Sequence, residues 1–334
     1  MKRNKCKTCL FSLGVVFVFF SYYLGISYIT RMIQGTDLVG GEVQKHYAAV
    51  ITKSGNSDFW KSVYAGARAA CTEYNLNLTL NAPENEEDYE VQNEMINEVV
   101  EAGAEAIIIS AIDYNANRPP IEAAIKKGVK VVVVDSEVNS DGVSCRISTD
   151  NYKAGGMAGD AVLASREEKL NVGIVNFDKN TANGQQREQG FRDRVEKDDR
   201  VTIIETINVI STAAAAREGT VSLLNRHPDI NVIVTFNEWT SLGVGYAVQD
   251  MQLAESTMVV AFDSNVISVG MLETGEVDAL IVQNPYSMGY LGVECAYKLI
   301  YGFPIEETEV DTATSLITKE NMFDEKYQRV LFPF

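Results

Sequence analysis

The sequence predicts an α/β protein with two doubly wound lobes, each built on a parallel β-sheet, behind an N-terminal membrane segment. Nine short runs rich in β-branched residues alternate along the chain with stretches of helical periodicity, an alternation that is typical of parallel sheets. Several runs are apolar throughout, as expected of strands that are covered on both faces. Nine strands are more than we expect in a single doubly wound domain, so two lobes fit the 334 residues better than one.

The first 30 residues are expected to form a cytoplasmic flank and a transmembrane anchor. Four basic residues precede an uncharged stretch from Thr8 to Thr30, and about 20 apolar residues suffice to span a bilayer. Because a basic flank stays in the cytoplasm, everything after Arg31 is expected outside. The alternative is a cleaved signal peptide, whose apolar region is usually ~7–15 residues long and is followed by small residues. Residues 31–45, which contain three glycines, are expected to form a short tether.

From Tyr47 onward, the expected elements alternate. The strand-like runs are residues 47–52, 76–80, 106–110, 129–134, 172–177, 201–207, 231–236, 258–262 and 279–283. Helical patterns occupy residues 58–74, 88–102, 117–127, 151–165, 184–197, 213–226, 239–250 and 285–301. Gly103, Gly128 and Gly302 stand where three of these helices should end, because glycine accepts the left-handed conformation that follows many helices.

Charge and residue inventory exclude several kinds of function. The chain has 29 basic and 46 acidic residues, and its net charge of −17 would repel a nucleic-acid backbone. Neither of its two histidines, His46 and His227, follows an expected strand. We therefore expect neither a histidine-containing catalytic triad nor a zinc site. The sequence also lacks the phosphate-binding G-K-[ST] loop and the G-x-S-x-G nucleophile motif. We therefore expect a binding protein without cofactor or metal ion, and not an enzyme.

Polar side chains follow most of the expected strands. In open parallel sheets, ligands bind beyond the carboxyl ends of the strands. The residues expected to bind a ligand are Asn56, Ser57, Phe59, Trp60, Ser110, Asp135, Arg187, Asn237, Asp263 and Gln283. Asp and Asn are also common turn and N-cap residues. As a set, however, carboxylate, amide and guanidinium groups suit the hydroxyls of a sugar or related polyol, and aromatic rings suit its C–H face.

The chain resembles the type I periplasmic sugar-binding proteins of the ribose/galactose-binding class, which serve ABC importers. The resemblance covers roughly residues 46–318. It rests on segments in the same order, among them AVITKSGNSDFWKSVYAGARAACTEYN, QQREQGF, VIVTFNEWTSLGVGYAV, VVAFDSN and ALIVQNPYSMGYLGVE. Lactose-repressor-type regulators share this fold, but here a membrane segment occupies the place of their helix-turn-helix.

The resemblance implies ligand contacts at matching positions. These are the aromatic pair Phe59 and Trp60, and then Asp135, Arg187, Asn237, Asp263 and Gln283. The departures from ribose-type members are Ser136 for an arginine, Ser110 for an asparagine, Asp58 for a proline, and Ser211 or Thr212 where a second-lobe aromatic is expected. Compared with ribose-type members, the expected pocket lacks the positive charge of an arginine and one aromatic ring. This difference argues against ribose itself and favours a larger sugar or a different polyol.

The resemblance also implies a three-crossover hinge, with crossovers near residues 149/150, 283/284 and 311/312. The first lobe is expected at 46–149 plus 284–311, and the second at 150–283 plus 312–334. A ligand that bridges the lobes favours the closed state. The implied function is that of a sugar receptor for a membrane permease of the ABC type. Together with the anchor expected at residues 1–30, the protein is expected to be extracytoplasmic, membrane-anchored and monomeric. The alternative is a tethered sensor subunit for a histidine kinase or chemoreceptor.

Overall fold

The structure, a computed structural model, describes residues 45–332. The expected cytoplasmic flank and anchor (1–30) and nearly all of the tether (31–45) lie outside the described residues, as do the last two residues of the chain. Within residues 45–332, no helix has the length and apolar character needed to cross a membrane.

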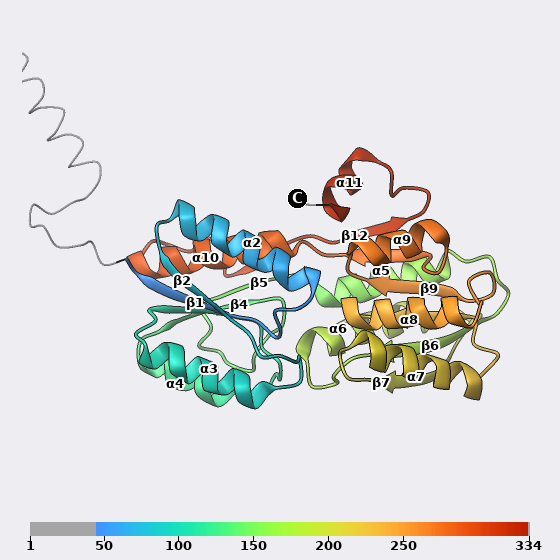
Figure 1. The fold of residues 1–334 in the computed structure, drawn as a ribbon, viewed down its shortest axis with the longest axis horizontal. Coiled ribbons are helices and arrows are strands. Elements are labelled where there is room, and N and C mark those ends of the chain that lie inside the picture. Colours follow the sequence, from blue (N-terminus) through green and yellow to red (C-terminus); the bar gives the residue numbers. More distant parts are fainter. Residues whose placement is uncertain (1–44, 333–334) are drawn as a thin grey trace, which may run out of the picture. The chain divides into compact units, whose positions relative to one another are not determined.

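The first lobe is built on a parallel sheet that, within the described residues, has six strands in the order β11-β5-β4-β3-β1-β2 (Figure 1). The strands are β1 (Tyr47–Ile51), β2 (Asn77–Asn81), β3 (Ala106–Ile109), β4 (Lys130–Val134), β5 (Cys145–Ser148) and β11 (Glu309–Asp311). Helices α2 (Asp58–Glu73) and α10 (Pro285–Tyr301) cover one face, and α3 (Tyr89–Glu101) and α4 (Arg118–Lys126) cover the other. Because successive side chains alternate across a strand, Val50 packs toward α2 and α10, whereas Ile51 packs toward α3 and α4.

The second lobe repeats this plan. In the described part of the chain its sheet also has six strands, in the order β12-β10-β9-β8-β6-β7, and β12 alone runs antiparallel to its neighbour. The strands are β6 (Leu170–Asn176), β7 (Val201–Asn208), β8 (Val232–Thr235), β9 (Met258–Phe262), β10 (Ala279–Val282) and β12 (Ser315–Thr318). The helices are α5 (Asn151–Leu163) and α6 (Ala182–Val195) on one face, and α7 (Ala213–Arg226), α8 (Glu238–Asp250), α9 (Val266–Thr274) and α11 (Glu325–Leu331) on the other.

The predicted fold of two α/β lobes with parallel-sheet cores is confirmed. Each of the nine expected strands and eight expected helices forms close to its expected bounds. Gly103 and Gly302 have φ values of 86° and 72° just after α3 and α10, the left-handed conformation expected of them. The sequence analysis missed strands β5, β11 and β12 and helices α9 and α11.

Between residues 45 and 332, the chain passes from one sheet to the other three times. It crosses after β5 into α5, after β10 into α10, and after β11 into β12. The last crossing contains Ala313, whose φ of 62° lies in the left-handed region, a conformation that costs energy for a residue with a Cβ atom. These crossings bring the carboxyl ends of the two sheets toward each other, and the residues that follow the strands meet there.

Candidate ligand-binding site

A polar cavity of about 30 Å³ lies between the two lobes. Its lining residues are Lys53, Ser57, Phe59, Trp60, Glu86, Asp135, Phe177, Asn183, Arg187, Asn237, Glu238, Trp239, Asp263 and Gln283. Eight of the ten residues expected from the sequence are among them. Since one water needs roughly 10–15 Å³ by this measure, the cavity has room for about two waters. A ligand larger than about two waters therefore enters only when the lobes or the lining side chains move apart.

The two remaining expected residues lie elsewhere. Asn56 is exposed on the first loop, where its amide donates to the carbonyl of Glu84 at 3.4 Å. Ser110 is buried below the cavity, and its hydroxyl donates to Asp135 Oδ2 at 3.1 Å. Ser110 thus supports a lining residue, and Asn56 is not brought to the cavity.

Asp135 and Asp263 occupy equivalent places in the two lobes. Asp135 directly follows β4 and Asp263 directly follows β9, and both have left-handed backbones, with φ values of 57° and 66°. Aspartate tolerates this conformation better than most residues that have a Cβ. Such strained positions cluster at ligand clamps and active sites, which favours a functional role for both carboxylates.

Arg187 organises the second-lobe side of the cavity. It projects from α6 and is 1% exposed. Its guanidinium donates to Asn151 Oδ1 at 2.8 Å, and to the Phe236 carbonyl and Gln283 Oε1 at 2.7 Å each. Gln283 in turn donates through Nε2 to Asp263 Oδ1 at 2.7 Å. The sequence predicts that Arg187 and Asp263 belong to one site. In the structure, Gln283 connects them by one hydrogen bond to each.

Burial raises the pKa of two cavity carboxyl groups, those of Asp263 and Glu238. It raises the pKa of Asp263 to about 7, although the nearby positive charge of Arg187 and the hydrogen bond from Gln283 lower it. Burial also raises the pKa of Glu238, against the lowering effect of the hydrogen bond from the Phe59 backbone. Both groups are thus easier to protonate in this arrangement than in water.

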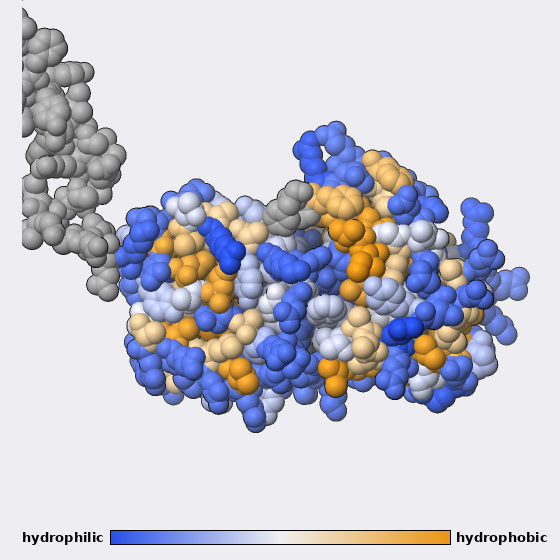
Figure 2. Space-filling model, in the orientation of Figure 1, coloured by the Kyte–Doolittle hydropathy of each residue, from blue (hydrophilic) through white to orange (hydrophobic). Residues whose placement is uncertain are grey.

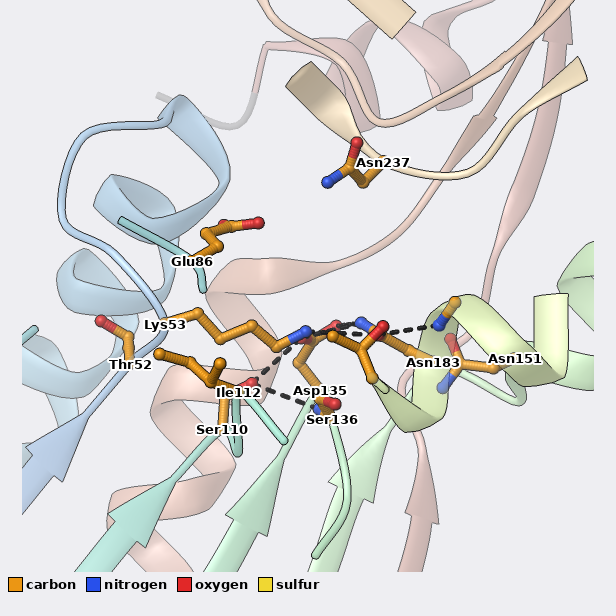
Figure 3. Close-up of polar contacts among 12 residues, drawn as sticks. Thr52, Lys53, Glu86, Ser110, Ile112, Asp135, Ser136, Asn151, Asn183 and Asn237 are labelled. Atoms are coloured by element: carbon orange, nitrogen blue, oxygen red, sulfur yellow. Dashed lines mark hydrogen bonds and ion pairs between the residues drawn. The ribbon is translucent and has the colours of Figure 1, made fainter. Parts of the chain in front are cut away.

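Lys53 is a cavity residue that the sequence analysis did not select. It follows β1 and is 2% exposed, and Figure 3 shows it reaching between Asp135 and Asn183. Its ammonium group donates to Asn183 Oδ1 at 3.2 Å and lies 3.8 Å from Asp135 Oδ2. It also lies 5.6 Å from the centre of the Phe177 ring, within range of a cation–π interaction. Its position directly after the expected strand at residues 47–52 was the signal that could have identified it.

Asn183 and Glu238 were missed as well. Asn183, near the start of α6, donates to both carboxylate oxygens of Asp135 at 3.2 and 3.1 Å. Glu238 follows the selected Asn237 at the start of α8. Both lie beside residues that were selected, since Asn183 is in the same helix as Arg187 and Glu238 directly follows Asn237.

The cavity offers hydrogen-bonding and aromatic groups. Between residues 45 and 332, no group of three or more His, Cys, Asp or Glu side chains is arranged to hold a metal ion. His46 contacts Glu105 and His227 contacts Glu205, and neither histidine lines the cavity.

A larger groove of about 650 Å³ adjoins the cavity and shares Phe59, Asp263 and Gln283 with it. It runs between α2, the starts of α9 and α10, and the end of α11. Figure 2 shows hydrophilic residues over much of this face of the described part, with several apolar areas, one of them near α9 and α11. Val266 on α9 is 74% exposed there.

Comparisons with known proteins agree with this architecture. A family model described as "Periplasmic binding protein domain" matches residues 48–303. The D-ribose/D-allose-binding protein of Pseudomonas aeruginosa is 25% identical over 294 residues, which cover 82% of this chain and 89% of that protein. A sugar transporter structure from Clostridium phytofermentans is 33% identical, has a TM-score of 0.75, and covers 82% of this chain and 100% of its own. A carbohydrate transporter solute-binding protein from Agrobacterium radiobacter, in complex with D-arabinose, is 27% identical, has a TM-score of 0.84, and covers 87% and 100%.

Proposed function

The chain belongs to the family of periplasmic binding protein domains, and we propose that it is an extracytoplasmic sugar-binding protein that delivers its ligand to an ABC-type importer. The family consists of solute-binding proteins, so the chain is a binding protein and not an enzyme. The observation that carries the proposal is the cavity, which is lined by carboxylate, amide and guanidinium groups of the two lobes together with Phe59 and Trp60. A few placed polar groups beside aromatic rings are what a small polyhydroxylated ligand requires.

The proposed ligand contacts are the eight expected residues that line the cavity, together with Lys53 and Asn183. We also propose lobe boundaries at 46–149 plus 284–311 and at 150–283 plus 312–334. The sheet membership of the strands supports these boundaries, because β1–β5 and β11 form one sheet and β6–β10 and β12 form the other. The protein is proposed to act as a monomer whose closed form is recognised by a membrane permease.

A thermal-shift screen of the full-length chain in detergent tests the proposed function. The relatives' names point to D-ribose, D-allose and D-arabinose as the first ligands, followed by other monosaccharides and polyols. A bound sugar at 100 times its Kd should add about 2.7 kcal/mol to the free energy of unfolding. The sugar should be recovered chemically unchanged. A complete screen without any stabilising sugar or polyol would contradict the proposal.

Import and sensing are separated by a transport measurement. If the gene is deleted, cells should lose uptake of the identified sugar, because the permease no longer receives it. The transporter names of the relatives support this outcome. Normal uptake together with loss of a sugar-induced response would instead favour the alternative of a sensor subunit for a histidine kinase or chemoreceptor.

We further propose that residues 1–30 anchor the protein in the cell membrane. The support is the uncharged stretch behind a basic flank. The protein should sediment with membranes, resist alkaline extraction, and keep its N-terminus. The double variant Val16→Asp/Val18→Asp should leave the membrane fraction, since each aspartate at the bilayer centre costs about 2.5–3.5 kcal/mol. Recovery of a soluble mature form that begins after residue 30 would instead identify a cleaved signal peptide.

A further inference from the structure

Glu238 belongs to the second lobe, but its carboxylate binds the start of a first-lobe helix. Its Oε2 accepts from the Phe59 N–H at 3.1 Å, and its Oε1 accepts from the Asp58 N–H at 3.3 Å. These are the first two residues of α2, and the N–H groups of a first helical turn have no acceptor within the helix. Asn265 holds the carboxylate in place from its own lobe, donating to Oε1 at 2.9 Å. Glu238 therefore caps α2 from across the cleft, where the helix dipole favours an anion.

Glu86 makes the converse contact, because it belongs to the first lobe and binds a residue of the second lobe. It lies in the first-lobe loop before α3 and is 8% exposed. Its Oε1 accepts from the indole N–H of Trp60 at 2.7 Å, and its Oε2 accepts from the hydroxyl of Ser211 at 2.7 Å. Ser211 lies in the second-lobe loop between β7 and α7, and its Oγ accepts from Asn237 Nδ2 at 2.7 Å. Figure 3 shows Glu86 and Asn237 on opposite sides of this gap.

We propose that Glu86 and Glu238 form a clasp that holds the two lobes closed and thereby determines how long the ligand is retained. The inference rests on the proposed function, because it concerns closure around a bound sugar. Each oxygen of both carboxylates already has a protein donor, so neither carboxylate needs the ligand for its hydrogen bonds. We assign both residues as positioning residues, which act through α2 and Trp60.

The clasp acts on the part of the first lobe that carries the aromatic pair. Phe59 and Trp60 belong to the first turn of α2, the turn that Glu238 caps. Trp60 is also held at its indole nitrogen by Glu86. When the lobes separate, the N–H groups of Asp58 and Phe59 lose their acceptor, and the contact between Glu86 and Ser211 breaks. Closure and the orientation of the aromatic pair are therefore coupled.

Intrinsic fluorescence provides a label-free measurement of the clasp. The chain has two tryptophans, Trp60 and Trp239, and both line the cavity. Stopped-flow fluorescence of the full-length chain with D-ribose, D-allose and D-arabinose as probes should show faster release from Glu238→Ala. The expected increase is about 5-fold to 150-fold, the equivalent of leaving a buried donor unsatisfied. The association rate should stay within about threefold of the parent, because interface changes act mainly on dissociation.

Three further variants make the test specific. Ser211→Ala removes the contact that Glu86 makes with the second lobe and should also speed release. Glu238→Gln keeps an oxygen acceptor and should release the sugar more slowly than Glu238→Ala. Asp250→Ala is the matched control, because Asp250 lies at the other end of α8 and pairs with Arg217 inside the second lobe. Release at the parent rate from both Glu238→Ala and Ser211→Ala would overturn the clasp.

Acrylamide quenching without sugar separates this inference from the proposed function. The clasp joins the lobes directly, so Glu238→Ala and Ser211→Ala should expose the tryptophans to quencher more than the parent or Asp250→Ala does. If no sugar binds but quenching rises in these two variants, the clasp stands and the proposed function fails. If sugar binds but neither quenching nor release changes, the clasp fails and the proposed function stands.

Discussion

Asp263→Ala should weaken sugar binding by roughly 30-fold to several thousand-fold, as titration calorimetry of the full-length chain would measure. Asp263 is 6% exposed in the cavity, and Gln283 holds it at 2.7 Å. Removing one partner of a buried, hydrogen-bonded charged set typically costs on the order of 2–5 kcal/mol, and about 1.4 kcal/mol corresponds to a factor of ten in Kd. The substitution leaves Gln283 Nε2 without its acceptor and leaves the charge of Arg187 less compensated.

Lys197→Ala is the control for this change, because Lys197 is exposed just beyond the end of α6. It should bind sugar as the parent does. An Asp263→Ala protein whose Kd is within threefold of the parent would show that Asp263 serves only the turn after β9, and that the cavity is not the sugar site.

The pH dependence of unfolding provides a second measurement for Asp263. Burial raises its pKa to about 7 in the folded protein, against about 3.9 in an unfolded chain. The folded state therefore holds the proton more tightly, and the contribution to stability is fully present below about pH 3.9 and is lost as the pH rises to about 7. Asp263→Ala should make the decline of unfolding free energy between these pH values shallower. The raised pKa of Glu238 acts in the same direction and remains in the variant.

Arg187 is a poorer probe of binding than Asp263, because the second lobe also depends on its hydrogen bonds. In the structure it is 1% exposed and makes three hydrogen bonds, to Asn151, Phe236 and Gln283. Its loss would leave buried acceptors of the second lobe unsatisfied, which is costly in itself. Arg187→Ala should therefore lower stability and affinity together.

The sequence predicts most of the fold because its strands are buried on both faces. Runs such as Ala106–Ile109 are fully buried, and such runs stand out against amphipathic helices. Strand β11 (Glu309–Asp311) has two exposed residues of three, and β5 (Cys145–Ser148) is only half buried. Helix α9 shows no clear apolar stripe, since Val266 is exposed while Val269 and Leu272 are buried. Elements that are short, or whose residues are buried without a regular period, do not show enough hydrophobic periodicity to be predicted from the sequence.

The sequence predicts those residues of the candidate site whose position depends on one lobe alone. Asp135, Asn237, Asp263 and Gln283 follow strands, so the topology alone places them at the sheet edge. The contacts of Glu86 and Glu238 depend on how one lobe meets the other, and a rule applied strand by strand cannot predict them. A helix was expected to begin at residue 88, and Asp88 is indeed the N-cap of α3, but its side chain makes no capping hydrogen bond. Two carboxylates beside it contact Ser211 instead.

Gly155→Ala should destabilise the protein on the order of 3 kcal/mol, the upper part of the usual range for overpacking a well-packed interface. Gly155 lies where α5 packs on α6, and a Cβ atom there would stand 1.9 Å from the backbone oxygen of Arg187. Gly190 makes the reciprocal approach, with a Cβ position 1.9 Å from the oxygen of Tyr152. Because backbone atoms are involved on both sides, no side-chain rotation relieves the contact, and the two helices must separate.

The same separation should reach the proposed sugar site. The atom that a Cβ of Gly155 would meet is the carbonyl oxygen of Arg187 itself, so a shift of α6 draws the guanidinium away from Asn151 and Gln283. Gly156→Ala is a matched control in the same helix, because its nearest neighbour is the oxygen of Gly190 at 4.0 Å. It should gain up to about 1 kcal/mol from helix propensity and bind sugar normally. Thermal melts of both variants measure the change in stability, and calorimetry measures the change in sugar affinity. If Gly155→Ala melts at the same temperature as Gly156→Ala, then α5 and α6 do not pack this closely, and their contact does not position Arg187.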